Sequence, residues 1–379
     1  MSKKEQQHST LDNFIKKIKK DPKKKVIYLG IIVALGIILV LIFFIFVLKG
    51  KNSSNEDSFL TDISTDLFGS AEEEEATIIP RRLDGVLAPK AEANIVPACV
   101  MIENAAFDGV RPQSGLSQAQ LVYEVIVEGG ITRFMAVFSN ATQANAVIGP
   151  VRSARDTYLE FVSELQCAYA HAGGSYTAMV AIPEFGLRDI DGLRESQYFN
   201  RVAVKFSPHN LFSSTDDLFR AIVDHNWSKE EEPSYQSWEF ADDFSSSAAP
   251  SINRIFIGFG GSYDVEYKYS VENNNYERYN GGVIQKDANN DQVLAPKNII
   301  IEHVGDGIPL PEKGRINWIV TGEGEVEIYH SGQKFTGKWK KDDRLSRTQF
   351  FDEKGNKIPL ERGTTWVEIV PPAIPVQAE

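Results

Sequence analysis

Cysteine is scarce in this chain: only Cys99 and Cys167 occur among its 379 residues. Both lie in apolar, strand-like segments, where a buried free thiol and a disulfide are equally reasonable. Outside the cytoplasm a disulfide is permitted, provided that the two Cα atoms lie within about 7 Å of each other. The sequence alone therefore leaves the state of the two cysteines open.

A metal-binding pattern, an internal repeat and a heptad pattern are also missing. Four histidines lie outside the motifs described below, and their spacing is not that of a zinc site. A structural zinc site is therefore not expected. These histidines are His8, His225, His303 and His330.

An excess of positive charge is absent beyond residue 25. Residues 1–25 contain nine lysines and three acidic residues, whereas the formal net charge of the whole chain is −12. The acidic balance of the larger part argues against nucleic acid as its main partner.

Charged residues are absent from residues 26–48, VIYLGIIVALGIILVLIFFIFVL. A helix of about 20 apolar residues spans the hydrocarbon core of a bilayer, so this segment predicts a transmembrane helix. A cleaved signal peptide would have an apolar region of about 7–15 residues followed by a small-residue cleavage site. Neither feature is present, and no cysteine follows that could carry a lipid.

The lysines around this apolar segment predict its orientation. Seven lysines lie within residues 16–25, but only Lys49 and Lys51 follow closely on the other side. The more basic flank stays in the cytoplasm. We therefore expect a basic cytoplasmic tail over 1–25, a single-pass signal anchor in the cell membrane over 26–48, and an extracytoplasmic remainder.

The extracytoplasmic part divides into three segments by composition. Residues 49–93, with the run Glu72–Glu75, predict an acidic flexible tether. Residues 94–240 alternate strand-like and helical patterns, which indicates an α/β domain with a mixed sheet and flanking helices. After a polar boundary, residues 252–372 predict a mostly β domain.

The segment LVYEVIVEGGITRFMAVFS (121–139) predicts a hairpin with Gly129-Gly130 as a two-residue turn. Pairing Glu128 with Ile131 would place Glu124, Glu128 and Arg133 on one face. Such a trio forms a cross-strand salt-bridge cluster or lines a cleft.

The motif IGPVRSARD (148–156) raises the question of an anion site, because it leads into a helix predicted from Asp156 to Leu165. Arginine binds phosphate oxygens through two bonds, and a helix N-terminus attracts anions. Arg152 and Arg155 could hold a phosphate, and Asp156 a magnesium ion. In the alternative interpretation, Asp156 caps the helix and the arginines pair with acids such as Glu160.

Two further motifs, HAGGS (171–175) and SPHNL (207–211), add polar residues after predicted strands. The glycines would let a ligand approach backbone amides closely. A serine nucleophile activated by the histidine of HAGGS is a weak hypothesis, because the spacing is not that of a catalytic triad. The residue pair 209–210 could instead form a helix-entry turn. The candidate ligand-binding residues in these motifs are His171, Gly173, Gly174, Ser175, His209 and Asn210.

These three motifs, together with the stretch RPQSGLSQAQLVYEVIVEGGITR (111–133) as a fourth, resemble the YerB-like bacterial lipoproteins, a family catalogued as domain of unknown function 3048 with N- and C-terminal parts. The resemblance covers about residues 80–370 and implies a cell-envelope protein with an unassigned biochemical role. Members with a lipobox are anchored by lipid, whereas this chain has the apolar segment 26–48.

A shorter resemblance involves the LytR-CpsA-Psr proteins. The matching stretches are Val151–Tyr158, Ala168–Gly174 and Ile190–Asp191, although the proline of the usual S-I-P-R-D motif is absent. This similarity implies transfer of glycans from polyprenyl pyrophosphate to the cell wall, with arginines and a magnesium-binding aspartate.

Three hypotheses follow. In the preferred one, a cleft lined by Arg133, Arg152, Arg155, Asp156, His171 and His209 binds an anionic or phosphorylated envelope ligand, either a wall glycan or a wall-synthesis protein. In the second, the protein is a magnesium-assisted phosphotransferase with Glu124 or Glu128 as base. In the third, it is a scaffold whose charged clusters are salt bridges. Magnesium is the one cofactor considered, and catalysis stays open.

Overall fold

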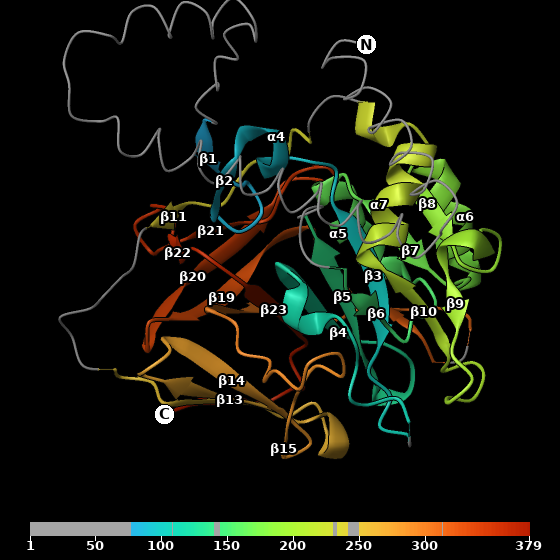
Figure 1. Cartoon of the computed structure of the whole chain (residues 1–379). Coiled ribbons are helices and arrows are strands. Elements are labelled where there is room, and N and C mark those ends of the chain that lie inside the picture. The colour runs from blue at the N-terminus through green and yellow to red at the C-terminus, as the bar shows by residue number, and fades with distance from the viewer. Residues whose placement is uncertain (1–76, 108, 140–144, 230–232, 242–249, 313) are drawn as a thin grey trace, which may run out of the picture. The chain divides into compact units, whose positions relative to one another are not determined.

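A ten-stranded mixed β-sheet forms the centre of the molecule (Figure 1). The computed structural model describes residues 77–379 except 108, 140–144, 230–232, 242–249 and 313. The sheet order is β21-β20-β19-β16-β23-β4-β5-β3-β7-β8. The strands are β3 (Ala98–Glu103), β4 (Leu121–Ile126), β5 (Thr132–Phe138), β7 (Ala168–His171), β8 (Arg188–Asp191), β16 (Asn298–His303), β19 (Gly322–His330), β20 (Gln333–Lys341), β21 (Gln349–Phe351) and β23 (Thr365–Val370).

Both halves of the sequence contribute to this sheet. The late strand β23 pairs in parallel with β4 on one side and with β16 on the other. The fold is therefore mostly β with a mixed sheet. The two expected segments, 94–240 and 252–372, share one sheet rather than forming two separate ones, because β23 returns to the middle of the first segment's strands.

A second, five-stranded sheet covers part of one face of the central sheet. Its order is β15-β14-β13-β12-β24, and helix α7 lies over the same face. Phe134 and Trp366 from the central sheet pack here with Tyr267 from the smaller sheet. The elements are α7 (Thr215–Asp224), β12 (Arg254–Ile257), β13 (Val265–Ser270), β14 (Asn275–Asn280), β15 (Val283–Ile284) and β24 (Val376–Ala378).

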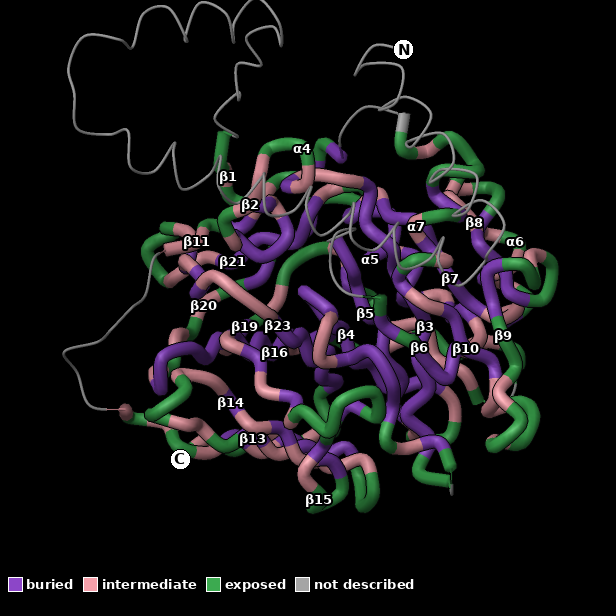
Figure 2. The backbone as a smooth tube through the Cα atoms, in the orientation of Figure 1, coloured by how far each residue is buried: buried purple, intermediate pink, exposed green. Residues whose placement is uncertain are grey.

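Helices α5 (Asp156–Leu165) and α6 (Tyr176–Glu184) cover the opposite face. Tyr158 and Phe161 of α5 pack on Tyr123 of β4, and the rings of Tyr123 and Phe161 stack at 4.1 Å. The central strands are consequently buried on both faces, as the purple tube in Figure 2 shows. This burial explains why their sequences are continuously apolar instead of alternating.

The helices expected from local signals are present. Helix α5 begins at Asp156 and ends at Leu165, as predicted. Ser214 caps α7, since its Oγ accepts a hydrogen bond from the Asp217 amide at 3.1 Å.

The tether expected over 49–93 does not extend that far. Strands β1 (Ile78–Pro80) and β2 (Leu87–Pro89) form a hairpin that leads into α4 (Lys90–Ala93). Leu83 is fully buried, and Arg82 donates to the Pro233 carbonyl at 3.1 Å. Residues 75–379 form one compact unit, so the folded part begins before residue 94.

The hairpin of β4 and β5 has a register one residue away from the expected one. Arg133 pairs with Val125, and Glu124 pairs with Phe134. The connection contains a 3₁₀ turn, η2 (Glu128–Gly130), so it is longer than a two-residue turn. A slip of one residue moves a side chain to the other face, and Arg133 therefore does not share a face with Glu124.

Cys99 on β3 and Cys167, just before β7, form a disulfide with a Cα–Cα distance of 5.9 Å. Both cysteines are buried. The question left open by the sequence is answered by the pairing of β3 with β7, which brings two segments 68 residues apart into contact.

The remaining short elements surround these layers. Strands β6 (Val147–Ile148), β10 (Leu211–Ser214) and β9 (Asn200–Arg201) form a small sheet. Two further pairs are β11 (Phe240–Ala241) with β22 (Leu360–Glu361), and β17 (Ile308–Pro309) with β18 (Ile316–Asn317). Within the described residues, no helix has the length and apolar character needed to cross a membrane. The predicted transmembrane segment 26–48 and the tail 1–25 lie outside those residues.

Candidate functional site

The sequence-predicted residues gather at one end of the central sheet. Strands β3, β7 and β8 are parallel, so their carboxyl ends meet at the same edge. Helices α5 and α6 begin there. We call this region the carboxyl edge and define it as residues 103–104, 151–156, 171–175, 189–194 and 207–210. In Figure 1, the loop that follows β3 lies at the bottom of the unit, whereas β1, β2 and α4 lie at the top.

Arg152 and His209 share one buried carboxylate at this edge. Glu103, the last residue of β3, lies with Oε1 3.3 Å from Arg152 Nε and with Oε2 2.8 Å from His209 Nδ1. Arg152 also reaches the Pro208 carbonyl at 3.4 Å. Its side chain is 21% exposed, compared with 4% for Glu103. Arg152 is thus loosely held and partly open to solvent.

Arg155 and Arg133 converge on Glu128 of the η2 turn. Arg155 forms a two-pronged ion pair with this carboxylate, with Nε 2.7 Å from Oε2. Arg133 lies 3.6 Å from Glu128 and donates to the Ser153 carbonyl at 2.7 Å. Burial alone would raise the pKa of Glu128, but the Arg155 hydrogen bond and the two positive charges lower it to about 2. This cluster fastens the hairpin connection to the start of α5.

Burial and the nearby charge of Arg155 lower the pKa of Arg133 to about 10. Both arginines are almost fully buried. Their guanidinium groups bind protein acceptors, and both side chains are buried instead of lining an open cleft.

Asp156 links the two helix N-termini. Its Oδ2 accepts a hydrogen bond from the Ser175 hydroxyl at 2.8 Å, and Ser175 caps α6 by accepting from the Ala178 amide at 3.3 Å. Among the residues that the structure describes, no group of three or more histidine, cysteine or acidic side chains could hold a metal ion. The assignment of magnesium to Asp156 stays a prediction.

His171 is buried between two acceptors. Its Nε2 lies 2.7 Å from Asp189 Oδ1, and its Nδ1 lies 2.9 Å from the Gly173 carbonyl. The Ser175 hydroxyl is directed to Asp156 and not to this imidazole. The contacts therefore do not form the histidine–serine pair that activates a nucleophile.

The glycines of HAGGS allow two segments to approach closely. The VRSARD segment bridges to Gly174 at Ala154. A Cβ atom on Gly174 would lie 2.8 Å from Met179 Sδ and 3.2 Å from the Ala154 Cβ. Gly173 has a φ of +61°, a conformation that favours glycine. These packing requirements explain both glycines without a ligand.

Asn210 lies on the outer rim of the carboxyl edge, where its Oδ1 accepts a hydrogen bond from Arg201 at 2.7 Å. Glu124 lies elsewhere, in the core between the two sheets. It accepts hydrogen bonds from Arg278 and from Asn104, the latter at 3.2 Å. Glu124 is fully buried, so the carboxyl edge does not contain it.

Sequence reasoning missed three partners that define these contacts: Glu103, Asp189 and Arg278. Glu103 is the last residue of a buried strand, and a charge in that position is a usable signal. Asp189 pairs with a residue 18 positions earlier, and Arg278 with one 154 positions earlier. No local pattern reports such distant pairings.

The arrangement leaves a small set of partly exposed basic side chains for a ligand. Arg152 and His209 are partly exposed, and Arg194 has a side chain that is 64% exposed beside Asp191. Arginine with loose partners can exchange them for phosphate or carboxylate oxygens. The carboxyl edge is thus suited to surface contact with an anion more than to enclosing a substrate.

Comparison with known proteins identifies a family and relatives of this chain. The family model described as "Protein of unknown function (DUF3048) N-terminal domain" matches residues 83–228, and its C-terminal counterpart matches residues 255–367. The chain is 28% identical over 278 residues to "Putative lipoprotein YerB" of Bacillus subtilis (strain 168), which covers 73% of this chain and 81% of the relative. The crystal structure of YerB from Bacillus subtilis matches with a TM-score of 0.69 and 26% identity, covering 79% of this chain and 99% of that one.

Proposed function

Because the chain belongs to the DUF3048 family, we propose that it is an extracytoplasmic envelope protein, held at the membrane by residues 26–48, whose carboxyl edge binds an anionic envelope ligand. The relative named as a lipoprotein supports a location at the outer face of the membrane. The hydrophobic segment 26–48 would replace the lipid as anchor.

The disulfide agrees with this location. Disulfides persist in oxidising compartments and are rare in the cytosol. The bond between Cys99 and Cys167 is buried in the central core. A domain that depends on it folds most readily outside the cytoplasm.

The position of Arg152 is the main observation in support of ligand binding at the carboxyl edge. Arg152 is the most exposed of the three predicted arginines, and its contacts with Glu103 and Pro208 are long. It lies beside His209 at the carboxyl edge, where both side chains contact Glu103.

The contacts favour binding over group transfer. Arg155 is committed to Glu128, and Glu124, a candidate base, is committed to Arg278 in the core. A phosphotransferase would need these groups free to act on a substrate.

Calorimetric titration of residues 75–379 tests whether the carboxyl edge binds an anionic ligand. The probe is a short polyprenyl pyrophosphate, titrated with and without magnesium into the wild type, Arg152→Gln and Arg220→Gln. Arg220 is a matched control, because it is an exposed arginine paired with Asp217 on α7. The proposal predicts binding that Arg152→Gln weakens at least tenfold and that Arg220→Gln leaves unchanged. Equal binding by all three proteins, or no binding by the wild type, would exclude the carboxyl edge as a pyrophosphate site.

A further inference from the structure

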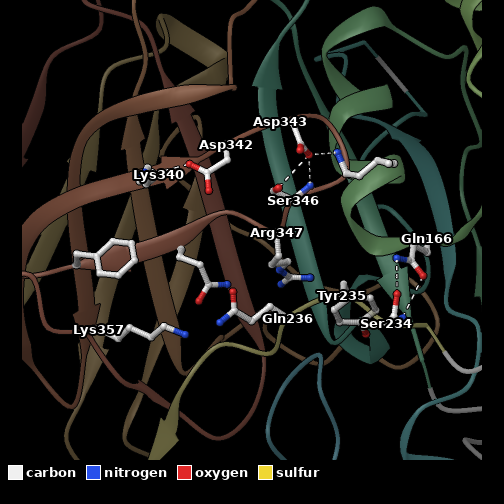
Figure 3. A pocket seen from close by; sticks show the side chains of 13 residues that line it. Gln166, Ser234, Tyr235, Gln236, Lys340, Asp342, Asp343, Ser346, Arg347 and Lys357 are labelled. Carbon is white, nitrogen blue, oxygen red and sulfur yellow. Dashed lines mark hydrogen bonds and ion pairs between the residues drawn. The ribbon is translucent and has the colours of Figure 1, made fainter.

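A cavity lies away from the carboxyl edge, beside the C-terminal end of α5 (Figure 3). It has a volume of about 590 Å³ and is formed by three parts of the chain: the end of α5, residues 234–236, and the segment from the end of β20 to Lys357. Its lining is mainly polar, with Gln166, Ser234, Gln236, Gln349, Arg347 and Lys357 among the side chains.

Arg347 is the unusual member of this lining. Its side chain is 1% exposed, and none of its three guanidinium nitrogens meets a hydrogen-bond acceptor among the residues that the structure describes. The guanidinium carbon lies 4.0 Å from the Trp238 ring centre and 5.4 Å from that of Tyr235. The aromatic rings stabilise the faces of the cation, but they leave its N–H edges unsatisfied.

The nearest carboxylate does not complete this site. Glu164 Oε1 lies 3.7 Å from Arg347 Nε, beyond hydrogen-bond distance. Glu164 is already bound by Lys341 at 2.6 Å and by the Tyr123 hydroxyl at 2.8 Å. Two buried cations therefore share one carboxylate. Buried groups that lack partners are costly, and each one calls for an explanation such as an additional bound group.

Glu302 lies in the same cluster, but it does not supply the missing negative charge at neutral pH. Burial and the charge of Glu164 raise the pKa of Glu302 to about 8. Its carboxyl group is consequently protonated at pH 7, and the cluster of Glu164, Glu302, Lys341 and Arg347 keeps a net positive charge.

At the mouth of the cavity, too, one positive charge lacks an acidic partner among the described residues. Asp342 pairs with Lys340 at 3.2 Å, and Asp343 accepts hydrogen bonds from the amide and hydroxyl of Ser346. Lys357 forms no ion pair with the described residues, so its charge is uncompensated. The acids at the mouth disfavour a multiply charged anion, while the free cations favour a single negative charge.

We infer that this cavity binds a small organic carboxylate that also carries an amide or hydroxyl group. The carboxylate satisfies the N–H edge of Arg347 through two bonds, Lys357 adds attraction at the mouth, and the exposed Gln236 amide binds the polar remainder. Figure 3 shows Arg347 between the loop of Asp343 and Ser346 and the segment of Tyr235 and Gln236. Since the guanidinium is covered, that segment moves outward when the ligand enters.

Two hydrogen bonds hold the covering segment in place. Gln166 Nε2 donates to the Ser234 hydroxyl at 3.2 Å, and the Ser234 amide donates to Gln166 Oε1 at 3.0 Å. These bonds join the segment to the end of α5. Ligand entry is therefore expected to perturb the Ser234 amide together with Arg347.

The test uses NMR on ¹⁵N-labelled residues 75–379, which form one compact unit with its own core. The probes are N-acetylglycine, its uncharged amide N-acetylglycinamide, and inorganic phosphate. We expect N-acetylglycine to shift the Arg347 Nε–H and Ser234 amide signals, and the uncharged amide to bind at least tenfold more weakly. Equal binding of the two compounds, tighter binding of phosphate, or no shift at Arg347 would overturn the inference.

Variants provide a second readout. Arg347→Lys retains the charge but removes the two-pronged geometry, so it is expected to weaken N-acetylglycine binding at least tenfold. Lys357→Gln alters only the mouth and is expected to weaken binding about twofold to fivefold. Lys354→Gln, an exposed lysine outside the lining, is the matched control and should have no effect. Binding unchanged by Lys357→Gln and by Arg347→Lys would contradict the assignment even if Arg347→Lys is less stable.

Discussion

Arg278 of β14 donates a hydrogen bond to Glu124 of β4, and this fully buried ion pair joins the five-stranded sheet to the central sheet. The Arg278 guanidinium also lies over the Trp366 ring at 4.4 Å. Glu368 of β23 lies opposite Glu124 in the parallel register and accepts the Tyr267 hydroxyl at 2.6 Å. Burial and the charge of Glu124 raise the pKa of Glu368 well above its usual range.

Removing one partner of this pair should be strongly destabilising. Arg278→Met leaves the Glu124 carboxylate buried without a counter-ion, and such losses typically cost about 3–5 kcal/mol. The measurement is urea unfolding of residues 75–379. The control is Arg254→Met in the half-exposed pair with Glu266, which should change the free energy of unfolding by less than about 1 kcal/mol. Similar small losses in both variants would show that the pair does not join the sheets.

The pairing also shows why the sequence predicted some parts of the molecule and not others. Helix α5 was predicted from the local sequence, and it appears where expected, from Asp156 to Leu165. The partner of Glu124 lies 154 residues away, and β23 enters the sheet beside β4 from the far end of the chain. Such pairings depend on topology, which local patterns do not encode.

For the candidate site as well, the sequence indicated some features and not others. Residues of the motifs lie together at the ends of β3, β7 and β8, because the carboxyl ends of parallel strands share an edge. Their role in ligand binding stays a prediction. The motifs did not reveal which arginine side chains are buried in ion pairs with acidic residues. Arg155 and Arg152 lie three residues apart in one motif, yet one is buried against Glu128 and the other is partly exposed above Glu103.

This difference predicts distinct effects of two equivalent substitutions. Arg155→Gln removes a buried, two-pronged ion pair and should reduce the free energy of unfolding by about 2–3 kcal/mol. Arg152→Gln removes a long, partly exposed contact and should cost less than about 1 kcal/mol. Chemical denaturation of both variants at pH 7 measures the two values. A larger loss in the free energy of unfolding for Arg152→Gln than for Arg155→Gln would mean that Arg152, not Arg155, stabilises the fold.

Glu302 predicts a pH dependence of stability. Its pKa in the folded protein is about 8, compared with 4.5 for an ordinary glutamate. Between these values the folded state holds a proton that the unfolded state releases, so the contribution of Glu302 to stability falls as pH rises from about 4.5 to 8, by at most about 1.4 kcal/mol per unit. Glu302→Gln cannot ionise and should gain stability relative to the wild type across this range.

The measurement is the free energy of unfolding of both proteins at pH 5 and pH 8. The difference between wild type and variant isolates Glu302 from other titrating groups. Glu325→Gln, at an exposed position of β19, is the control and should follow the wild type at both pH values. If the wild type and Glu302→Gln differ in free energy of unfolding by the same amount at both pH values, the assigned protonation of Glu302 is wrong.

The disulfide predicts a loss of stability on removal. It closes a loop of 68 residues, and the chain-entropy model assigns such a loop a stabilisation of about 4 kcal/mol. The double substitution Cys99→Ala/Cys167→Ala should lower the free energy of unfolding by up to that amount. Comparison with oxidised wild type by urea unfolding gives the value. Equal stability of the two proteins would show that the bond does not contribute to the fold.

The location of the folded unit outside the cytoplasm is the central claim, and thiol labelling in intact cells tests it most directly. The two native cysteines are joined in a buried disulfide, so added cysteines report alone. We would place one at exposed Lys354 and one at Ser9 in the basic tail, and apply a membrane-impermeant maleimide. The account predicts labelling of Lys354→Cys in intact cells and of Ser9→Cys only after permeabilisation. Protection of Lys354→Cys until the cells are permeabilised, with labelling of Ser9→Cys in intact cells, would contradict it.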